Sequence, residues 1–553
     1  MLRLALLTLL SVHTANAALG PENVFVIAAG NITESMDLAK QYMSLRAIPS
    51  NRLCEITGIG GPTWPSDALT YAQYKDVFFP QIEACVDRSG AADELVAFVL
   101  MRGLPRRVYG ATPSNTTSSR LSLAAMLSLW RSTCVGGPAG VENNCDGAVA
   151  GAPMYAQRNY NPIKTWPYAY QPVNILQQNT TCKQSMMVGS SFLLSALQFF
   201  DRRWLSPFYY DALQQLPGPP TKTFPPGFTR VRDKTKWVPA LVTALDGYTY
   251  SDALRLVRSG MQAEAAGPAS WLSADARFVL MHGPHPTGPR EELSFQYPYV
   301  ANQTCALLDK SFPHTGFNCS RQVQDVKFAT NEHFGGPIAA FFVGTAQLNH
   351  TVENNTYVNG TLVDNLTSFG CMPRNFNASG GHLQVAVSRW IEKGVGGAHG
   401  TTDEPNDGTA FPDRMMLLDY IKGASLAEAY LQRIPYAGWR NLVIGDALTQ
   451  PYCPRPTIAA RWNAGDASAV DVVVSAPPGV TAEEMSVGAF ADGVRIADVR
   501  RSDRDASRWT VRAEGTPGDT TVSVLVVAEV RYGAGPGVAH CAVPVKGWAT
   551  LRV

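Results

Sequence analysis

The chain has 553 residues, a formal charge of +1 at pH 7 and a charged fraction of only 16%. This balance argues against a nucleic-acid-binding protein, because such domains usually carry a clear basic excess. A chain of this length is expected to bury a large core and to form at least two domains.

The first 17 residues are typical of a secretory signal peptide. Arg3 precedes an apolar run from Leu4 to Val12, and the sequence Ala-Asn-Ala at 15–17 supplies a cleavage pattern. The run is shorter than the roughly 20 apolar residues that span a bilayer, and no later stretch reaches that length. We therefore expect a secreted or secretory-lumen chain that begins near Ala18 and has no transmembrane anchor.

Apolar runs that end abruptly in polar residues alternate with helical patterns over residues 18–455. The expected strands begin near residues 24, 94, 238, 276, 338, 361, 395 and 441, and helices are expected at 32–47, 248–266 and 380–393. This alternation predicts an α/β fold with a mostly parallel, helix-covered sheet of caspase-like or flavodoxin-like outline. Between about 110 and 236 the pattern lapses, and we interpret this segment as a long irregular insertion, with a separate small domain as the alternative.

Residues 456–553 have a different character. Short alternating runs are divided by Gly, Pro, Asp and Ser, and no helical pattern interrupts them. About a hundred residues of this kind predict a C-terminal β-sandwich.

The chain contains ten cysteines, and none lies in the signal peptide. An even number in an exported chain favours disulfides. The pairs closest in sequence, Cys134 with Cys145 and Cys305 with Cys319, are candidates for local bridges. No metal site is expected, because there is no C-x-x-C pair and the histidines lack ligand spacing. No nucleotide cofactor is expected either, since no G-x-G-x-x-G or P-loop follows the first strand.

Asn-x-Ser/Thr sequences mark candidate N-glycosylation sites. They are densest between residues 302 and 377, which indicates an exposed, glycan-shielded region. The candidates are Asn31, Asn115, Asn179, Asn302, Asn318, Asn349, Asn354, Asn359, Asn365 and Asn377.

Several strings occur in an order that resembles a known family. They include "ENVFVIAAGNITESMDLAKQYMSLRAIPSNRLCEI", "LVAFVLMRGLPRRV", "LVTALDGYTYSDALRLV", "LVDNLTSFG", "GVGGAHGTTDEP" and "LVIGDALTQPY". The chain from Pro21 to Tyr452 is similar to an uncharacterised secreted-protein family found mainly in bacteria with exosortase sorting systems. The resemblance implies fold and order but no reaction. Family members usually have histidine and glycine where this chain has Asn365 and Cys371.

A weaker resemblance is to caspase- and gingipain-type cysteine peptidases. Their outline of successive strands and a helix is similar to "FFVGT", "LVDNLTSFGC", the helix through Trp390 and "VGGAHGT". The catalytic dyad does not match, because Gly344-Thr345 stands where the peptidases have His-Gly.

Cys371 has three interpretations. A nucleophile needs a lowered pKa, usually from an adjacent imidazole, and His282, His350, His382 and His399 are the available partners. The export signal and the even cysteine count favour a disulfide instead. A free inert thiol is the third interpretation.

The remaining candidates follow strand patterns, where ligands bind in open parallel sheets. His399 with Asp403 and Glu404 suits general acid–base catalysis, and the alternatives are a turn with backbone-capping carboxylates or a calcium loop through Asp407. Arg102 suits an anion anchor, or else forms an internal ion pair with Asp246. We expect Arg102, Asp246, His282, Ser368 and the 399–404 segment to share one edge, with Arg102, Asp246, His399 and Glu404 lining one pocket.

Two functions follow from these expectations. In the first, the α/β domain binds, and in an enzymatic form hydrolyses, an extracellular peptide or glycan polymer at this edge. In the second, the chain is a non-enzymatic surface or matrix adhesion glycoprotein. An open cleft that joins His399 to a carboxylate or thiol would favour the enzyme.

Overall fold

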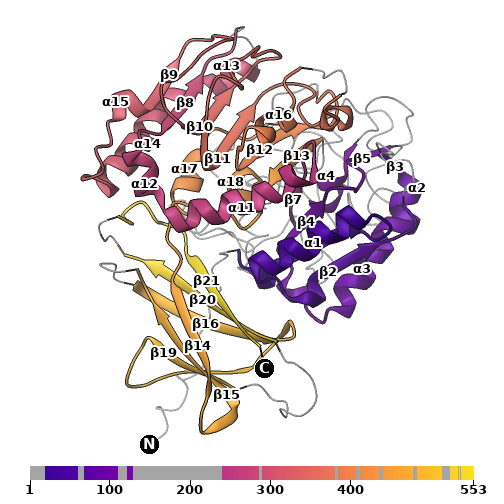
Figure 1. Cartoon of the computed structure of the whole chain (residues 1–553), viewed down its shortest axis with the longest axis vertical. Helices are drawn as coiled ribbons and strands as arrows, with labels where there is room; N and C mark the ends of the chain where they lie inside the picture. The colour runs from indigo at the N-terminus through magenta and orange to yellow at the C-terminus, as the bar shows by residue number, and fades with distance from the viewer. Residues whose placement is uncertain are drawn as a thin grey trace, which may run out of the picture.

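The apolar runs of the α/β region form one ten-stranded sheet in the computed structural model (Figure 1). The structure describes residues 19–59, 68–109, 121–128, 240–284, 289–379, 384–405, 411–431, 433–434, 440–477, 482–512, 523–533, 535 and 537–552. The sheet order is β2-β1-β4-β7-β13-β12-β11-β10-β8-β9. The strands are β1 Val24–Ala29, β2 Leu53–Ile56, β4 Ala97–Met101, β7 Leu241–Leu245, β8 Arg277–Met281, β9 Val323–Val326, β10 Ile338–Val343, β11 Tyr357–Asn365, β12 Gly397–Thr401 and β13 Asn441–Gly445. The expected α/β class is confirmed.

Not every pairing in the sheet is parallel, because β13 runs antiparallel to β12. The register pairs Gly397, the first residue of β12, with Gly445, the last residue of β13. Both positions lie against the side chain of Leu426, and a Cβ at Gly397 would lie 2.4 Å from its Cδ1 atom. The two glycines therefore let Leu426 pack directly on the strand backbones.

Helices flank the sheet, and Figure 1 shows α1 and α11 side by side across its front in this view. Helix α11 begins with a capping box in which Thr249 and Asp252 satisfy each other's backbone N–H groups. The helix predicted at 380–393 is shorter than expected, since α16 covers six residues before Gly394 adopts φ +91°. The described helices are α1 Thr33–Arg46, α2 Tyr71–Gln73, α3 Phe79–Arg88, α4 Leu123–Ser128, α11 Tyr250–Ala266, α12 Pro268–Ser273, α13 Pro289–Ser294, α14 Tyr297–Ser311, α15 Cys319–Gln322, α16 Val387–Glu392, α17 Met416–Ile421 and α18 Leu426–Leu431.

The predicted insertion lies mostly outside the described residues. Its described parts contribute to a small sheet of β3 Ala68–Thr70, β5 Arg107–Tyr109 and β6 Leu121–Ser122.

The C-terminal region forms two four-stranded sheets, as predicted for a β-sandwich. One has the order β14-β15-β19-β18 and the other β17-β16-β20-β21. Valines from both sheets form a shared core. The strands are β14 Thr457–Asn463, β15 Asp466–Ser475, β16 Ala482–Ala491, β17 Val494–Arg495, β18 Asp498–Arg501, β19 Arg508–Arg512, β20 Ser523–Tyr532 and β21 Val545–Arg552.

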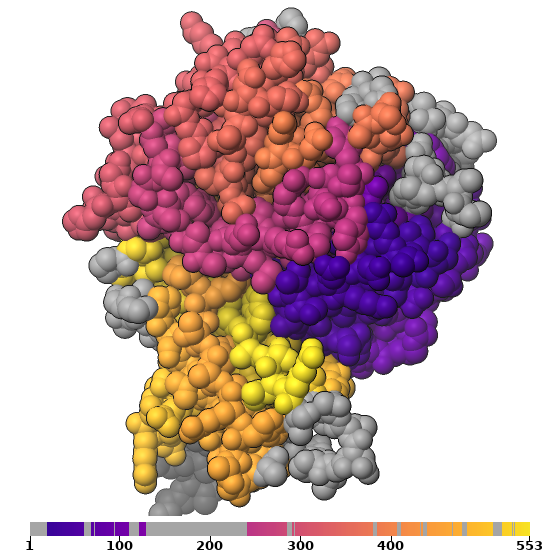
Figure 2. All heavy atoms as spheres, in the orientation of Figure 1, coloured from indigo at the N-terminus to yellow at the C-terminus, as the bar shows by residue number. Residues whose placement is uncertain are grey.

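The sandwich is fixed to the α/β region, and Figure 2 shows its orange and yellow atoms in direct contact with indigo and magenta atoms. The disulfide Cys453–Cys541 joins the connecting segment to the sandwich. Lys546 Nζ lies 2.6 Å from Glu22 Oε1, and the Arg52 guanidinium donates to the Gly493 carbonyl. Covalent, ionic and hydrogen-bonded contacts thus hold the two regions together.

Two further disulfides lie within the α/β region. Cys54–Cys85 links β2 to α3. Cys305–Cys319 confirms the predicted local bridge. The candidate pair Cys134–Cys145 lies outside the described residues.

Candidate functional site

His399 lies in the middle of β12, not at its end, and its imidazole is enclosed. Its Nδ1 is 2.8 Å from Asp364 Oδ1 on β11, and its Nε2 is 2.9 Å from Asn441 Oδ1 at the start of β13. The side chains of His399 and Asp364 have no exposed area. Each ring nitrogen therefore already has a partner inside the protein.

Asp364 also forms an ion pair with Arg414. Arg414 is fully buried and donates from Nη2 to the Val343 carbonyl at 3.2 Å. Burial alone would lower the pKa of this guanidinium, but the Asp364 carboxylate raises it above its ordinary value. Asp364 thus joins a buried cation to a buried imidazole, an arrangement typical of a structural network.

Cys371 is a free, buried thiol, so the disulfide predicted for it is wrong. Strand β11 ends at Asn365, and the chain then turns so that Cys371 N donates to the Thr401 carbonyl at 3.0 Å. Its sulfur lies 3.6 Å from the Leu442 carbonyl, inside the fold. Burial raises the pKa of the thiol well above its ordinary value, which opposes formation of a thiolate.

Arg102 and Asp246 form the internal ion pair that was the alternative to an anion anchor. Arg102 Nη1 lies 3.1 Å from Asp246 Oδ1 and also donates to the Gly247 carbonyl at 2.9 Å. The second carboxylate oxygen of Asp246 pairs with Arg106. One buried carboxylate therefore holds two arginines, and the sequence did not predict the second.

Asp403 and Glu404 follow β12 in a turn. Asp403 Oδ1 accepts from the Glu404 N–H at 2.9 Å, the backbone-capping alternative considered above. Asp403 Oδ2 also lies 3.5 Å from Arg107 Nη1, and the Glu404 carbonyl accepts from Arg440. Asp407, invoked for a calcium loop, lies outside the described residues.

Bridging contacts link most of the strand-end residues that were expected to share an edge, but His282 is not among the residues that these contacts connect. Arg106, paired with Asp246 after β7, stacks 4.0 Å from the ring centre of Phe376, which follows Cys371. The adjacent Arg107 reaches Asp403 after β12. Ser368 joins the same edge, because its carbonyl accepts from Thr401 Oγ1 at 2.7 Å. His399 does not line an open pocket with these residues, because it is buried within its strand.

A second histidine–carboxylate pair was not predicted as a site. His282 follows β8, and its Nε2 lies 2.6 Å from Asp325 Oδ1 on β9. The two side chains are 37% and 32% exposed. The ring of Tyr297 packs against the imidazole at a centroid distance of 5.1 Å. The sequence placed His282 at a strand end, but β9 was not predicted, so the carboxylate had no assigned position.

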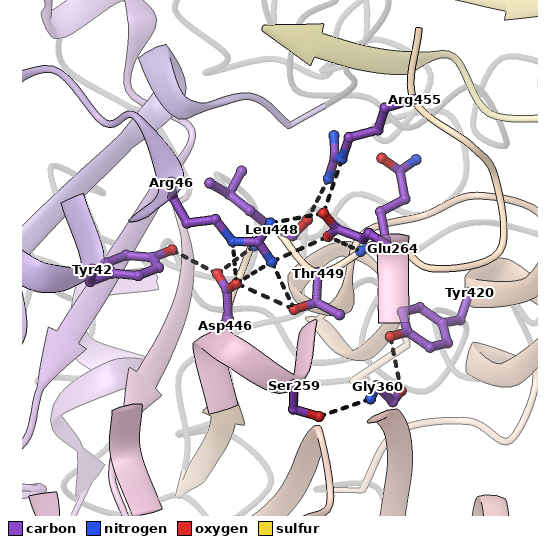
Figure 3. A network of polar contacts seen from close by, with 11 residues as sticks. Tyr42, Arg46, Ser259, Glu264, Gly360, Tyr420, Asp446, Leu448, Thr449 and Arg455 are labelled. Carbon is purple, nitrogen blue, oxygen red and sulfur yellow. Dashed lines mark hydrogen bonds and ion pairs between the residues drawn. The ribbon is translucent and has the colours of Figure 1, made fainter. Parts of the chain in front are cut away.

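The end of β13 lies at the opposite end of β12 from Asp403, and it carries a separate buried network (Figure 3). Asp446 accepts from Arg46 Nε at 2.6 Å and from the Tyr42 hydroxyl at 2.8 Å. Arg46 also binds Glu264 on α11, and Glu264 lies 3.4 Å from Arg455 in the connection to the sandwich. This network ties α1, α11 and the connecting segment together, which gives Asp446 a structural role.

Cys453, His540 and Cys541 are close enough to hold a metal ion. The two sulfurs are joined in a disulfide, and His540 Nε2 lies 2.8 Å from the Tyr452 carbonyl. Disulfide sulfurs lack the thiolate charge that metal ligation by cysteine requires. Burial lowers the pKa of His540 to about 4, so this imidazole is neutral at pH 7.

Seven of the eight candidate glycosylation asparagines in the described ranges are exposed. The eighth, Asn365, is 4% exposed, and its Oδ1 accepts from the Thr345 N–H at 3.0 Å. A glycan has no room at Asn365 in this fold. The exposed ones are Asn31, Asn302, Asn318, Asn349, Asn354, Asn359 and Asn377.

Comparison with known proteins shows only distant likenesses. No family model matches the chain, and no curated protein matches it. A structure of the Arg-specific cysteine proteinase gingipain R has a TM-score of 0.35 at 10% identity, covering 57% of this chain and 76% of that chain. A complex of the pro- and mature domains of Porphyromonas gingivalis RgpB gives the same score and identity, with 57% and 77% covered. A structure described as a protease has a TM-score of 0.40 at 11% identity over 97% and 98% of the two chains. At these scores, the likeness carries no argument about activity.

Among the described helices, none combines the length and apolar character needed to cross a bilayer.

Proposed function

We propose that this chain is a secreted glycoprotein that binds an extracellular polymer or surface component without hydrolysing it at His399. The burial of His399 is the observation that carries this proposal. A general acid or base must reach the proton that it transfers, and this imidazole has no exposed area and a partner at each nitrogen. The raised pKa of the buried Cys371 thiol likewise opposes a nucleophilic role.

The secreted and glycosylated parts of the proposal have their own support. Three disulfides among the described residues suit an oxidising compartment. Seven exposed sequons offer acceptor asparagines on the surface. The resemblance to secreted proteins of exosortase-carrying bacteria belongs to this proposal as well.

Hydrolysis at His282 is the second candidate function. The Asp325 carboxylate orients one ring nitrogen of His282, and the imidazole is more than one-third exposed. A carboxylate-oriented, accessible imidazole is suited to general acid–base catalysis. This candidate places the chemistry at β8 and β9 instead of β11 and β12.

The test measures binding and cleavage of fluorescently labelled peptide and glycan polymers by the full chain and by His399→Gln and His282→Gln. We expect binding without release of fragments, unchanged in His282→Gln. Cleavage that is lost in His282→Gln would establish the second candidate. Cleavage that is lost in His399→Gln, with an unchanged circular dichroism spectrum and unfolding midpoint, would overturn the first.

A further inference from the structure

Arginines are concentrated in one part of the β-sandwich. From Arg495 to Arg512 the sequence holds six arginines and three aspartates, an excess of three positive charges, whereas the whole chain carries only +1. All six arginines are exposed. The segment contains β18 and β19, the outer two strands of one sheet.

Strand pairing places several of these side chains on one face. Val511 and its partner Val499 pack in or against the sandwich core, so the alternate residues Thr510 and Arg500 point to the outer face. Arg461 on β14 lies in the same cross-strand row, because it pairs with Asp471 on β15 and Asp471 pairs with Thr510.

Arg508 and Arg512 flank Thr510 along β19, each about 7 Å away along the strand. Together with Arg461 and Arg500 they form what we call the arginine face. Figure 1 shows β15 and β19 in the part of the sandwich away from the ten-stranded sheet.

Each arginine of this face has its own aspartate partner, yet remains accessible. The excess of three positive charges therefore belongs to the Arg495–Arg512 segment as a whole and not to these four pairs. The side chains of Arg461, Arg500, Arg508 and Arg512 are 79%, 76%, 62% and 55% exposed. Their closest N···O distances to aspartate range from 2.6 Å for Arg500–Asp498 to 3.9 Å for Arg461–Asp471. Exposed pairs of this kind are weak, so the guanidinium groups can turn towards an external anion at little cost.

We propose that the arginine face binds an acidic polysaccharide that carries carboxylate or sulfate groups. A guanidinium donates two parallel N–H groups to such an anion, and four of them on a flat sheet face can follow an extended chain. The inference rests on the proposed binding function and specifies its ligand class. It places the binding surface on the sandwich, away from the buried His399.

Protection of a sheet edge is the competing role for these arginines. Strand β18 is an edge strand, and charged side chains on such strands prevent pairing with other chains. That role requires charge but no particular ligand. A binding measurement therefore separates the two roles.

The experiment measures the affinity of the full chain for immobilised alginate, dextran sulfate and neutral dextran at low and high salt. The variant Arg500→Ser, Arg508→Ser, Arg512→Ser should bind the acidic polymers about tenfold more weakly, since each lost exposed pair contributes a few-fold. The control removes the same charge from exposed positions in the α/β region through Arg321→Ser, Arg374→Ser and Lys393→Ser. It should bind within about twofold of the unsubstituted chain. The alginate and dextran sulfate arms distinguish carboxylate from sulfate recognition.

Several outcomes would overturn the inference. An equal loss in the control would mean that overall charge, not the arginine face, drives binding. Binding to neutral dextran, or another neutral polymer, with no effect of the triple substitution would leave the proposed binding function standing and remove this one. Tighter binding of duplex DNA than of either polymer through the same arginines would assign the face to nucleic acid. If the unsubstituted chain bound none of these three polymers, this inference would fail, while the measurements with labelled peptide and glycan polymers would still decide the proposed binding function.

Discussion

Two histidine–aspartate pairs lie on neighbouring strands in the described part of the chain, and they differ in their exposure and in their other partners. His399–Asp364 joins β12 to β11 at 2.8 Å with no exposed side-chain area. His282–Asp325 joins the ends of β8 and β9 at 2.6 Å, with about one-third of each side chain exposed. The first pair is also bound to Arg414 and Asn441. Each imidazole packs against one aromatic ring, Phe411 for His399 and Tyr297 for His282.

The comparison shows that the same two side chains serve different purposes in different surroundings. A buried ionic pair must be satisfied on all sides, because an unpaired buried charge is costly. An exposed pair contributes little to stability and keeps its imidazole available. We therefore expect substitutions in the first pair to change the free energy of unfolding and substitutions in the second to change mainly reactivity.

Asp364→Asn should have the largest effect. The substitution leaves Arg414 buried without a counter-charge, and breaking a buried ion pair in this way costs about 3–5 kcal/mol. The change is measured by urea unfolding monitored by circular dichroism. Asp325→Asn is the matched control and should change the free energy of unfolding by less than about 1 kcal/mol. Equal effects of the two substitutions would contradict the distinction.

His399→Ala should cost about 2–3 kcal/mol. It removes two buried hydrogen bonds and leaves the Asp364 carboxylate and the Asn441 amide each short of one partner. Guanidinium chloride unfolding of this variant and of His282→Ala gives the comparison. A stable His399→Ala variant would show that the imidazole is not needed for the fold, and would reopen a functional role for it.

The sheet was largely predictable from the sequence, whereas the partners in the two pairs were not. Long apolar runs such as β1 and β10 are buried along their whole length, so their composition alone identifies them. Strand β9 has only four residues, two of them polar, and gave no such pattern. Because β9 was not predicted, Asp325 was not recognised as a partner of His282.

The register of neighbouring strands explains why the partners of His399 were not predicted. The sequence placed His399 at a strand end with Asp403 and Glu404, because these residues are adjacent in the chain. The fold instead pairs it with residues 35 and 42 positions away, through the alignment of β11, β12 and β13. Neither this alignment nor the antiparallel direction of β13 is encoded in local periodicity. Arg102 and Asp246 were recognised as a possible pair because each follows a strong strand pattern.

Cys371, which packs against the end of β12, is another buried side chain whose substitution should change stability and not reactivity. Cys371→Ala should cost about 1–2 kcal/mol through loss of a buried sulfur from a packed site. In the unsubstituted folded chain, iodoacetamide at pH 7.5 should leave the Cys371 peptide unlabelled and should label it after denaturation, as read by mass spectrometry. Rapid labelling of the folded chain would mean that the thiol is accessible and ionised, contrary to its burial.

His282→Gln should have the smallest effect on stability, below about 0.5 kcal/mol, because its side chain is partly solvated and the amide preserves a polar contact to Asp325. Reactivity, not stability, is the property that distinguishes this residue. Diethyl pyrocarbonate modifies accessible neutral imidazoles, so the His282 peptide should be labelled in the folded chain while the His399 peptide becomes labelled only on unfolding. Asp325→Asn should change the labelling rate of His282 and leave that of His399 unaltered, because the Asp325 carboxylate contacts the imidazole of His282 and not that of His399. Equal protection of both histidines in the folded chain would show that His282 is not accessible. That result would contradict the difference in exposure between the two pairs.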